Sequence, residues 1–267
     1  MGFGWIKPEE YSFHSLLLFE RFQISYMFRP GREDKWRRHM GIALNANPAV
    51  KWYLERRCPE RAGIIAQIAA EAPVTENARK IREAEVYVIE SAEDFMIYTT
   101  PEAMAERCDF IRGWNKQRLF SLADFTGKTV LDVGAGSGRL TFAAAEKAMW
   151  VYASEPAGTL REFMREKIAR ENIRNVRVLD GFVTALPFPD STFDIVMSGH
   201  VMGDDWDNEI AETSRVCKNG GWLLNCPGDS ERHLKPKEEL TSRGFEEFHY
   251  VGSFGKDVYI QRKQAIK

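Results

Sequence analysis

The sequence has little net charge and no long apolar run. Among its 267 residues, 37 lysines and arginines nearly balance 39 aspartates and glutamates, giving a formal net charge of -2. No overall basic field therefore draws the chain to nucleic acid or anionic lipid. No apolar stretch is long enough to cross a bilayer, and the short apolar run 16–19 is flanked by charge and lacks a signal cleavage site. We therefore expect a cytoplasmic protein without membrane contact.

Paired cysteines and internal repeats are missing too. The four cysteines stand far apart and form no C-x-x-C pair, which is typical of reduced thiols and indicates no metal site. No segment repeats at a fixed period. A hydrophobic content of 44% is enough for a sizeable core, so the composition predicts a soluble globular protein.

What the sequence does contain is a glycine-rich turn between an apolar strand and a helix. The run VLDVGAGSGR, residues 130–139, has glycines at Gly134, Gly136 and Gly138 in the spacing G-x-G-x-G. Glycine allows positive φ and lets a ligand approach main-chain atoms that a Cβ would shield. This turn predicts a small-molecule site.

The residues before this turn have mainly helical patterns interrupted at prolines. Thr100 can cap a helix that Pro101 opens, whereas the stretch 86–99 fits either a strand or a helix. Aromatic residues are frequent here, and most are expected in a helical core. The hydroxyl of Tyr26 is a candidate substrate contact. We predict a helical, substrate-covering region over residues 1–122.

One segment of this region carries a mixed basic and aromatic pattern. Residues 29–38, RPGREDKWRR, are compatible with a nucleic-acid surface. Glu33 and Asp34 within the segment favour a solvated helix face instead.

From residue 123 onward, strand and helix patterns alternate, which is typical of βα units wound into a parallel sheet. The last two strands flank a glycine-containing turn and predict a closing hairpin. The predicted fold is α/β, with a Rossmann-like, seven-stranded, mostly parallel sheet and an antiparallel last strand, plus the N-terminal mainly helical region. The predicted strands are 130–133, 150–154, 176–179, 193–197, 222–225, 245–251 and 258–262.

Several motifs in the second half occur in a familiar order. LDVGAGSGR is followed by YASEP, LDGF, LPFPDSTFDIVMSGHV and EIAETSRVCKNGGWLL, in which Asn219 replaces a usual proline. In these motifs the chain resembles the class I S-adenosylmethionine-dependent methyltransferases, particularly the group called methyltransferase type 11. The resemblance implies that residues 123–267 bind S-adenosylmethionine and that a small molecule receives the methyl group.

The resemblance also implies which residues contact the cofactor. Asp132 would lie near its amino group. Glu155 would bind the ribose hydroxyls, or alternatively cap the helix after Pro156, and Asp180 would accept the adenine amino group or only form an Asp-Gly turn. The implied cofactor-binding residues are Asp132, Gly134, Ala135, Gly136, Gly138, Glu155, Pro156, Asp180, Gly181, Phe182, Ser198 and Gly199.

A nicotinamide or flavin enzyme is the competing interpretation of the glycine turn. Dinucleotide binding requires G-x-G-x-x-G, but Arg139 stands at the position of the third glycine. The carboxylate of Asp132 would also be unhelpful beside a pyrophosphate. The sequence therefore favours a methyltransferase.

Acceptor chemistry is less defined. His200 follows the fourth predicted strand of the sheet and is a candidate base, substrate contact or structural residue. Trp206 is a candidate substrate contact or an ordinary packing residue, and Asp205 or Asp207 a candidate helix start. An RNA methyltransferase and a non-catalytic S-adenosylmethionine-binding regulator remain alternatives, and the oligomeric state is open.

Overall fold

The computed structural model describes residues 4–266, and the chain divides into two compact units, Met1–Met104 and Ala105–Lys267. This division lies earlier than the boundary predicted after residue 122. The reason is the packing of α8 (Gln117–Phe120) and the residues that follow it. Leu119 and Leu122 are both buried in the core of the second unit, beside Phe125. Part of the predicted helical region therefore belongs to the sheet unit.

The first unit is helical, as predicted. Helix α2 packs against both α4 and α5, and the predicted cap residue Thr100 precedes the helix that Pro101 opens. Buried aromatic side chains, among them Phe19 and Phe28, fill the core. The helices are α1 (Arg21–Met27), α2 (Asp34–Ala46), α3 (Pro48–Arg57), α4 (Ala62–Glu71), α5 (Ala78–Ser91), α6 (Glu93–Met96) and α7 (Pro101–Arg107), with short 3-10 turns at Pro8–Glu10, Phe13–Leu18, Pro59–Arg61 and Ile97–Thr99.

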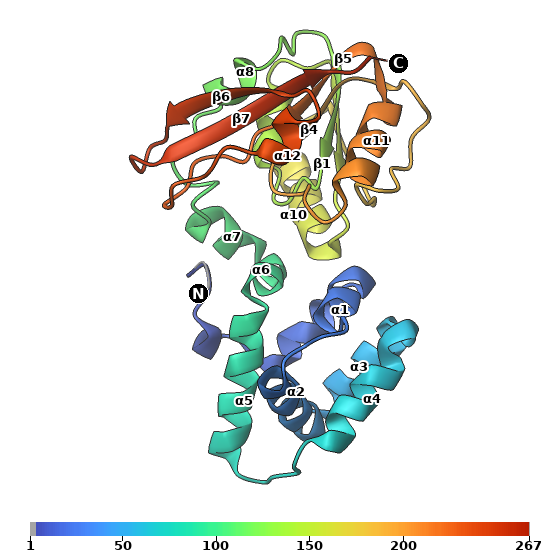
Figure 1. Ribbon diagram of the computed structural model, residues 1–267, viewed down its shortest axis with the longest axis vertical. Helices are drawn as coiled ribbons and strands as arrows, with labels where there is room; N and C mark the ends of the chain where they lie inside the picture. Colours follow the sequence, from blue (N-terminus) through green and yellow to red (C-terminus); the bar gives the residue numbers. More distant parts are fainter. Residues whose placement is uncertain (1–3, 267) are drawn as a thin grey trace. The chain divides into compact units, whose positions relative to one another are not determined.

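The second unit contains the predicted seven-stranded sheet, in the order β3-β2-β1-β4-β5-β7-β6 (Figure 1). β7 pairs antiparallel with both of its neighbours, and the other strand pairs are parallel. The predicted fold class is confirmed. The strands are β1 (Thr129–Val133), β2 (Trp150–Ser154), β3 (Val176–Leu179), β4 (Phe193–Ser198), β5 (Cys217–Asn225), β6 (Glu246–Val251) and β7 (Asp257–Gln264).

Helices cover both faces of this sheet because alternate strand residues point to opposite sides. Val130 and Val151 belong to the hydrophobic cluster under α8 and α9, whereas Leu131 and Val196 belong to the cluster under α11. The helices of this unit that have not yet been named are α9 (Arg139–Ala145), α10 (Gly158–Arg170), α11 (Trp206–Val216) and α12 (Glu238–Thr241).

The strand order contains one point at which its direction changes. β1 pairs with β2 on one side and with β4 on the other, so the chain reverses its winding direction at β1. In open α/β sheets, ligands bind beyond the carboxyl ends of the strands at such a point. The glycine turn follows β1 and therefore lies there.

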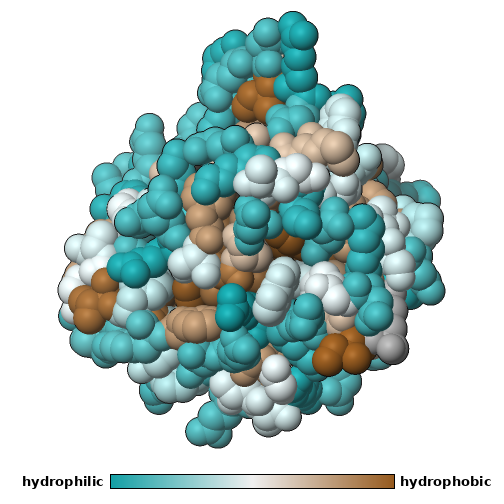
Figure 2. Space-filling view, turned by 90° about the horizontal axis from the view of Figure 1, so that it is seen from above, coloured by the Kyte–Doolittle hydropathy of each residue, from teal (hydrophilic) through white to brown (hydrophobic). Residues whose placement is uncertain are grey.

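The surface carries no broad apolar area on the face shown in Figure 2, where hydrophobic residues form small separate groups among hydrophilic ones. Single exposed apolar side chains of this kind are normal for a folded chain. Within residues 4–266, none of the helices is long and apolar enough to cross a membrane.

Candidate functional site

The glycine turn is held by main-chain bonds to the neighbouring strand. The N–H groups of Gly134 and Ala135 donate to the carbonyl of Ser154, at 2.8 and 3.1 Å. Gly134 has φ +62°, and a Cβ there would lie 2.1 Å from Cγ2 of Val201. The turn is therefore closed too tightly for any side chain at residue 134.

A similar limit applies where the turn enters α9. Gly138 has φ +92°, and a Cβ there would meet the ring of Phe142 at 2.4 Å. The helix begins directly after it, so main-chain N–H groups of its first turn face the end of the sheet. Steric crowding therefore explains why the first and last positions of the G-x-G-x-G turn are glycine.

Glu155 ties the turn to the end of β2. Its side chain is buried, and its carboxylate oxygens accept from the N–H of Gly136 at 2.9 Å and of Ala157 at 2.8 Å. Burial raises the pKa of Glu155 to about 7, although these two N–H groups oppose the shift. Each carboxylate oxygen can accept a second hydrogen bond, so this arrangement leaves capacity for hydroxyl donors of a ligand.

Asp132 is the second buried carboxyl group beside the turn. It accepts from the Thr141 hydroxyl at 2.6 Å. Burial raises the pKa of Asp132 to about 7, while the Thr141 bond and the charge of Arg139 oppose that shift. A cation brought near Asp132 would favour its ionised form.

Two serine hydroxyls flank β1 at its carboxyl end. Ser154 on β2 and Ser198 on β4 are both in register with Val133, so the three side chains point to the same face of the sheet. Both hydroxyl groups are buried, and within residues 4–266 neither oxygen has a hydrogen-bond partner. Unsatisfied buried polar atoms are rare and require a reason, such as a ligand.

The predicted adenine-binding residues lie at the end of β3. Asp180 is exposed and forms an ion pair with Arg161 at 3.2 Å. Gly181 lies against β2, because a Cβ there would approach the Ser154 oxygen to 2.5 Å. The ring of Phe182 is 43% exposed, so part of it is available to a planar ligand.

His200 lies in the loop after β4. Its Nε2 is 2.5 Å from the carbonyl oxygen of Pro227, and its ring packs on Phe110 with centroids 4.5 Å apart. Because a carbonyl only accepts hydrogen bonds, Nε2 carries the proton and Nδ1 carries the lone pair. His200 is an exposed residue, yet desolvation of its ring beside Phe110 and then the charge of Arg139 lower its pKa to about 4. His200 is therefore neutral at neutral pH.

Arg139 carries a cation into the same region. Its Nη2 donates to the carbonyl of Cys226 at 2.7 Å, and its guanidinium carbon lies 4.5 Å from the ring centroid of Trp114. In the described part of the chain, its buried Nη1 has no hydrogen-bond partner. Desolvation lowers the pKa of Arg139. The residue that breaks the dinucleotide motif is thus a desolvated cation close to His200.

The loop between β4 and α11 is organised by Glu209. This buried carboxylate accepts from the N–H groups of Gly203, Asp204 and Asp205, at 2.8, 3.3 and 3.2 Å. Asp205 in turn caps α11 by accepting from the N–H of Asn208, which confirms it as a candidate helix start.

Trp206, the candidate substrate contact, is the first residue of α11. It packs partly buried against the hydrophobic cluster under that helix, with the ammonium of Lys237 5.6 Å from its ring centroid. Tyr26, the other candidate, is 37% exposed and belongs to the first unit.

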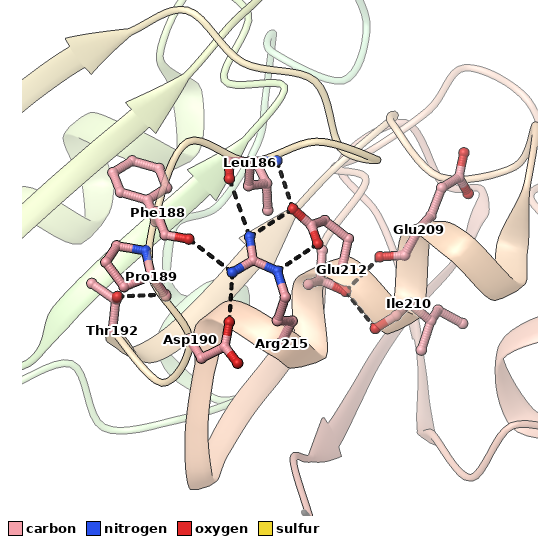
Figure 3. A network of polar contacts seen from close by, with 10 residues as sticks. Leu186, Phe188, Pro189, Asp190, Thr192, Glu209, Ile210, Glu212 and Arg215 are labelled. Atoms are coloured by element: carbon pink, nitrogen blue, oxygen red, sulfur yellow. Dashed lines mark hydrogen bonds and ion pairs between the residues drawn. The ribbon is translucent and has the colours of Figure 1, made fainter.

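A second network fixes the chain between β3 and β4 to α11 (Figure 3). Arg215 donates to the carbonyl oxygens of Phe188 at 2.8 Å and Leu186 at 3.2 Å. It also forms ion pairs with Asp190 and Glu212, both at 2.7 Å. One side chain therefore joins a long loop to the helix that holds the Glu209 loop.

Part of the sheet unit is similar in sequence to known methyltransferases. Residues 130–221 match a family described as "Methyltransferase domain". An uncharacterized methyltransferase of Geobacillus sp. (strain WCH70) is 28% identical over 148 residues, which cover 53% of this chain and 67% of that protein. The ubiquinone/menaquinone biosynthesis C-methyltransferase of Marinomonas sp. (strain MWYL1) is 28% identical over 145 residues, 52% of this chain and 56% of that protein.

The fold has a counterpart of known structure. A SAM-dependent methyltransferase from Aquifex aeolicus superposes with a TM-score of 0.51 at 18% identity, covering 62% of this chain and 98% of that chain. Residues 130–221 therefore match a methyltransferase domain, and the sheet unit has the fold of the S-adenosylmethionine-dependent methyltransferase from Aquifex aeolicus. The chain spans about half to two thirds of the length of the curated relatives just named. The finer placement in the type 11 group stays a prediction.

The residues around the turn fit S-adenosylmethionine, on which the Aquifex aeolicus protein depends. The turn at Gly134 has no room for a side chain, the hydroxyls of Ser154 and Ser198 have no protein partner, and two buried carboxyl groups lie beside the turn. A ligand with a cationic end, hydroxyl groups and a planar base would satisfy these groups.

Sequence reasoning missed several residues of this region. Thr141 and Glu209 act through hydrogen bonds to groups in other turns or elements, and Arg139 was considered only as a missing glycine. The position of Glu209 in the sequence could have indicated its role. This residue follows the cap residue Asp205 by four positions, on the first turn of a helix, where a carboxylate can reach the N–H groups before the helix.

Proposed function

We propose that this protein transfers a methyl group from S-adenosylmethionine to a small-molecule acceptor. The observation that carries the proposal is the turn at Gly134 with the unpartnered hydroxyls of Ser154 and Ser198 beside it. The sulfonium of the cofactor supplies an activated methyl group and a good leaving group. The protein's main task is then to hold the acceptor in line with that methyl, so alignment supplies much of the rate enhancement.

The proposed roles of the cofactor residues follow their positions. Asp132 faces the amino group of the methionine portion, and Glu155 accepts from the ribose hydroxyls with its remaining capacity. Asp180 and Phe182 at the end of β3 recognise the adenine. The main chain of the turn, together with its neighbours, lines the rest: Gly134, Ala135, Gly136, Gly138, Pro156, Gly181, Ser198 and Gly199.

His200 contributes to acceptor binding in this proposal. A base with a pKa of about 4 removes a proton from a phenol or an amine inefficiently at neutral pH. Its Nδ1 is instead a hydrogen-bond acceptor, held in place by the bond from Nε2 to Pro227. We therefore assign His200 to orienting a donor group of the acceptor, with Trp206 as a further proposed contact.

A small acceptor is supported by one relative, which is named as a C-methyltransferase of ubiquinone/menaquinone biosynthesis. The RNA alternative gains no support from residues 29–38. Trp36 is 4% exposed and unavailable for stacking on a base, and Arg37 forms an ion pair with Glu71 at 2.6 Å. A cytoplasmic location is part of the same proposal.

Calorimetric titration of the full chain with S-adenosylhomocysteine tests cofactor binding, and micromolar affinity is expected. Absence of binding at millimolar concentration would overturn the proposal. Incubation with S-adenosylmethionine and a panel of small acceptors then tests transfer, measured as release of S-adenosylhomocysteine. Binding without release over a broad panel would favour the regulator instead.

The role of His200 has its own test once an acceptor is known. His200→Gln should raise KM for the acceptor, because the fixed Nδ1 acceptor is lost. The shape of the pH–rate profile should stay unchanged, because glutamine keeps hydrogen-bonding capacity and His200 is already neutral at neutral pH. Loss of the acid limb of the profile, where a catalytic base becomes protonated, would show that His200 acts as a base after all.

A further inference from the structure

The helical unit contains a polar pocket that the methyltransferase site does not use. It has a volume of about 140 Å³ and is formed where the end of α1 and the following turn meet α2 and the α5–α6 junction. Its lining includes Tyr26, Arg29, Arg32, Trp36 and Asp94. A cavity of roughly 150 Å³ holds a benzene-sized molecule, so this one admits a small metabolite.

Two guanidinium groups lie on aromatic rings in this pocket. The guanidinium carbon of Arg29 is 4.1 Å from the ring centroid of Tyr26, and that of Arg32 is 4.9 Å from the ring centroid of Trp36. Arg32 also donates from Nε to the carbonyl of Met27 at 2.8 Å. These contacts hold both planes in place before any ligand arrives, which lowers the ordering cost of binding.

Neither guanidinium is in direct contact with a carboxylate in the described part of the chain, although the charge of Asp94 acts on Arg32. Within residues 4–266, Arg29 and Arg32 form no ion pair, although most other arginines of the helical unit do. Desolvation, followed by the charge of Arg29, lowers the pKa of Arg32. Two guanidinium groups that act on each other electrostatically in one pocket favour an anionic ligand there.

A carboxyl group faces the same pocket. Asp94 is the second residue of α6 and forms no ion pair in the described part of the chain. Desolvation raises the pKa of Asp94, and the charge of Arg32 opposes this shift. With Asp94 ionised, the lining carries two positive charges and one negative charge, a net charge of +1. A ligand with two carboxylates and one ammonium group has the opposite pattern.

The frame of the pocket is rigid. Trp36 donates from its indole nitrogen to the Ser91 hydroxyl at 2.9 Å, and Phe95 packs edge-on against Tyr26 with centroids 5.4 Å apart. Trp36 itself is buried. These contacts join α1, α2 and the α5–α6 junction, so the charged groups are presented by packed helices.

We propose that this pocket binds a small amino dicarboxylate, with its carboxylates on Arg29 and Arg32 and its ammonium group on Asp94. The inference does not depend on methyl transfer, because every residue it uses belongs to the helical unit. It gives this unit a binding function of its own.

The test is calorimetric titration of the full chain with three ligands of similar size. L-aspartate has all three charged groups, succinate lacks the ammonium, and L-asparagine lacks one carboxylate. Aspartate should bind at least about tenfold more tightly than either of the others, as expected for losing one charge-assisted hydrogen bond. Equal binding of the three ligands, or no binding of aspartate at millimolar concentration, would overturn the proposal.

Variants locate the site. Arg29→Gln should weaken aspartate binding about tenfold or more, and Asp94→Asn should abolish the preference for aspartate over succinate. Arg38→Gln is the matched control, since Arg38 is an exposed arginine on α2 that does not line this pocket. Unchanged aspartate binding in Arg29→Gln, or equal weakening in Arg38→Gln, would contradict the assignment. Affinity for S-adenosylhomocysteine should be the same in all three variants, which separates this proposal from the one above.

Discussion

Asp132 shows how burial sets the chemistry of a single residue at the end of β1. In the folded protein its pKa is raised from the ordinary value of 3.8 to about 7, with burial as the largest cause. The unfolded chain loses this proton near pH 4, whereas the folded chain retains it up to about pH 7. The folded state therefore binds more protons between these limits, and the free energy of unfolding falls as pH rises through them. Glu155 acts with the same sign.

The prediction is that Asp132→Asn flattens this pH dependence. Asparagine does not titrate, so stability should fall less between about pH 5 and about pH 7 than in the parent protein. Urea unfolding of the sheet unit at these two pH values measures the effect. Asp204→Asn, an exposed side chain in the same unit, should keep the slope of the parent. Parallel slopes for Asp132→Asn and the parent would show that this carboxyl group does not titrate in that range.

Gly134→Ala should reduce affinity for S-adenosylhomocysteine by at least about tenfold, because both the +62° φ and the contact with Val201 oppose a side chain. Gly63→Ala is the control. Gly63 lies in α4 with open space around its Cβ, so alanine there should be neutral or stabilising by up to about 1 kcal/mol. Calorimetry and thermal unfolding measure both variants. Retention of full affinity in Gly134→Ala would mean that the turn relaxes at little cost.

For single residues, the sequence could predict positions that depend only on the local order of strand, turn and helix. Asp132, Glu155 and the glycines lie at strand ends or in a turn, and the motif spacing locates both. The state of Arg139 and of His200 depends on partners far away in the chain, at Cys226 and Pro227. No local pattern contains that information.

Among the elements, α11 is joined to the loop before β4 through the side chain of Arg215. Arg215→Lys removes the planar group that reaches two carbonyls and two carboxylates at once. Because lysine is a single point donor, we expect the variant to lose about 1–3 kcal/mol of stability. Urea denaturation measures it. Arg243→Lys, which removes a more exposed ion pair with Asp207, should change stability by less than about 0.5 kcal/mol. A similar loss in both would mean that the Figure 3 network contributes no more than one surface pair.

Strand and helix order were predictable over most of the sheet unit, because a period of two alternates there with a period near 3.6. The stretch 86–99 was not, since its β-branched residues fit both patterns. The structure resolves it as helical. Asn77 caps α5 by accepting from the N–H of Lys80, and Val88 and Ile89 are buried on one side of that helix. The deciding signals are an upstream cap and tertiary burial, neither of which lies in the stretch itself.

For the whole molecule, the position of the division between units leads to a prediction about fragments. A fragment of residues 105–267 should fold and bind S-adenosylhomocysteine, because it keeps the complete core of the sheet unit. A fragment of residues 123–267 should be unfolded or strongly destabilised. It lacks Leu119 and Leu122, and each buried leucine contributes about 1.5–3 kcal/mol.

Dispersion of amide signals in NMR spectra and calorimetry with S-adenosylhomocysteine distinguish the two fragments. Equal folding of both would show that α8 is dispensable and would support the boundary predicted from composition. The predicted boundary differs from the division into compact units because a short helix before a strand gives no sign of which core it joins.

The place of β7 in the sheet has a consequence for synthesis on the ribosome. β7 is the last strand in the sequence but lies between β5 and β6, and β6 pairs only with β7. While the chain emerges, the parallel strands can pair with one another. Until β7 has emerged, β6 has no partner strand and the edge of β5 stays open. Open edges of this kind attract wrong partners. A chain stalled after β6 should therefore be a substrate for chaperones, and release of β7 closes the sheet in one step.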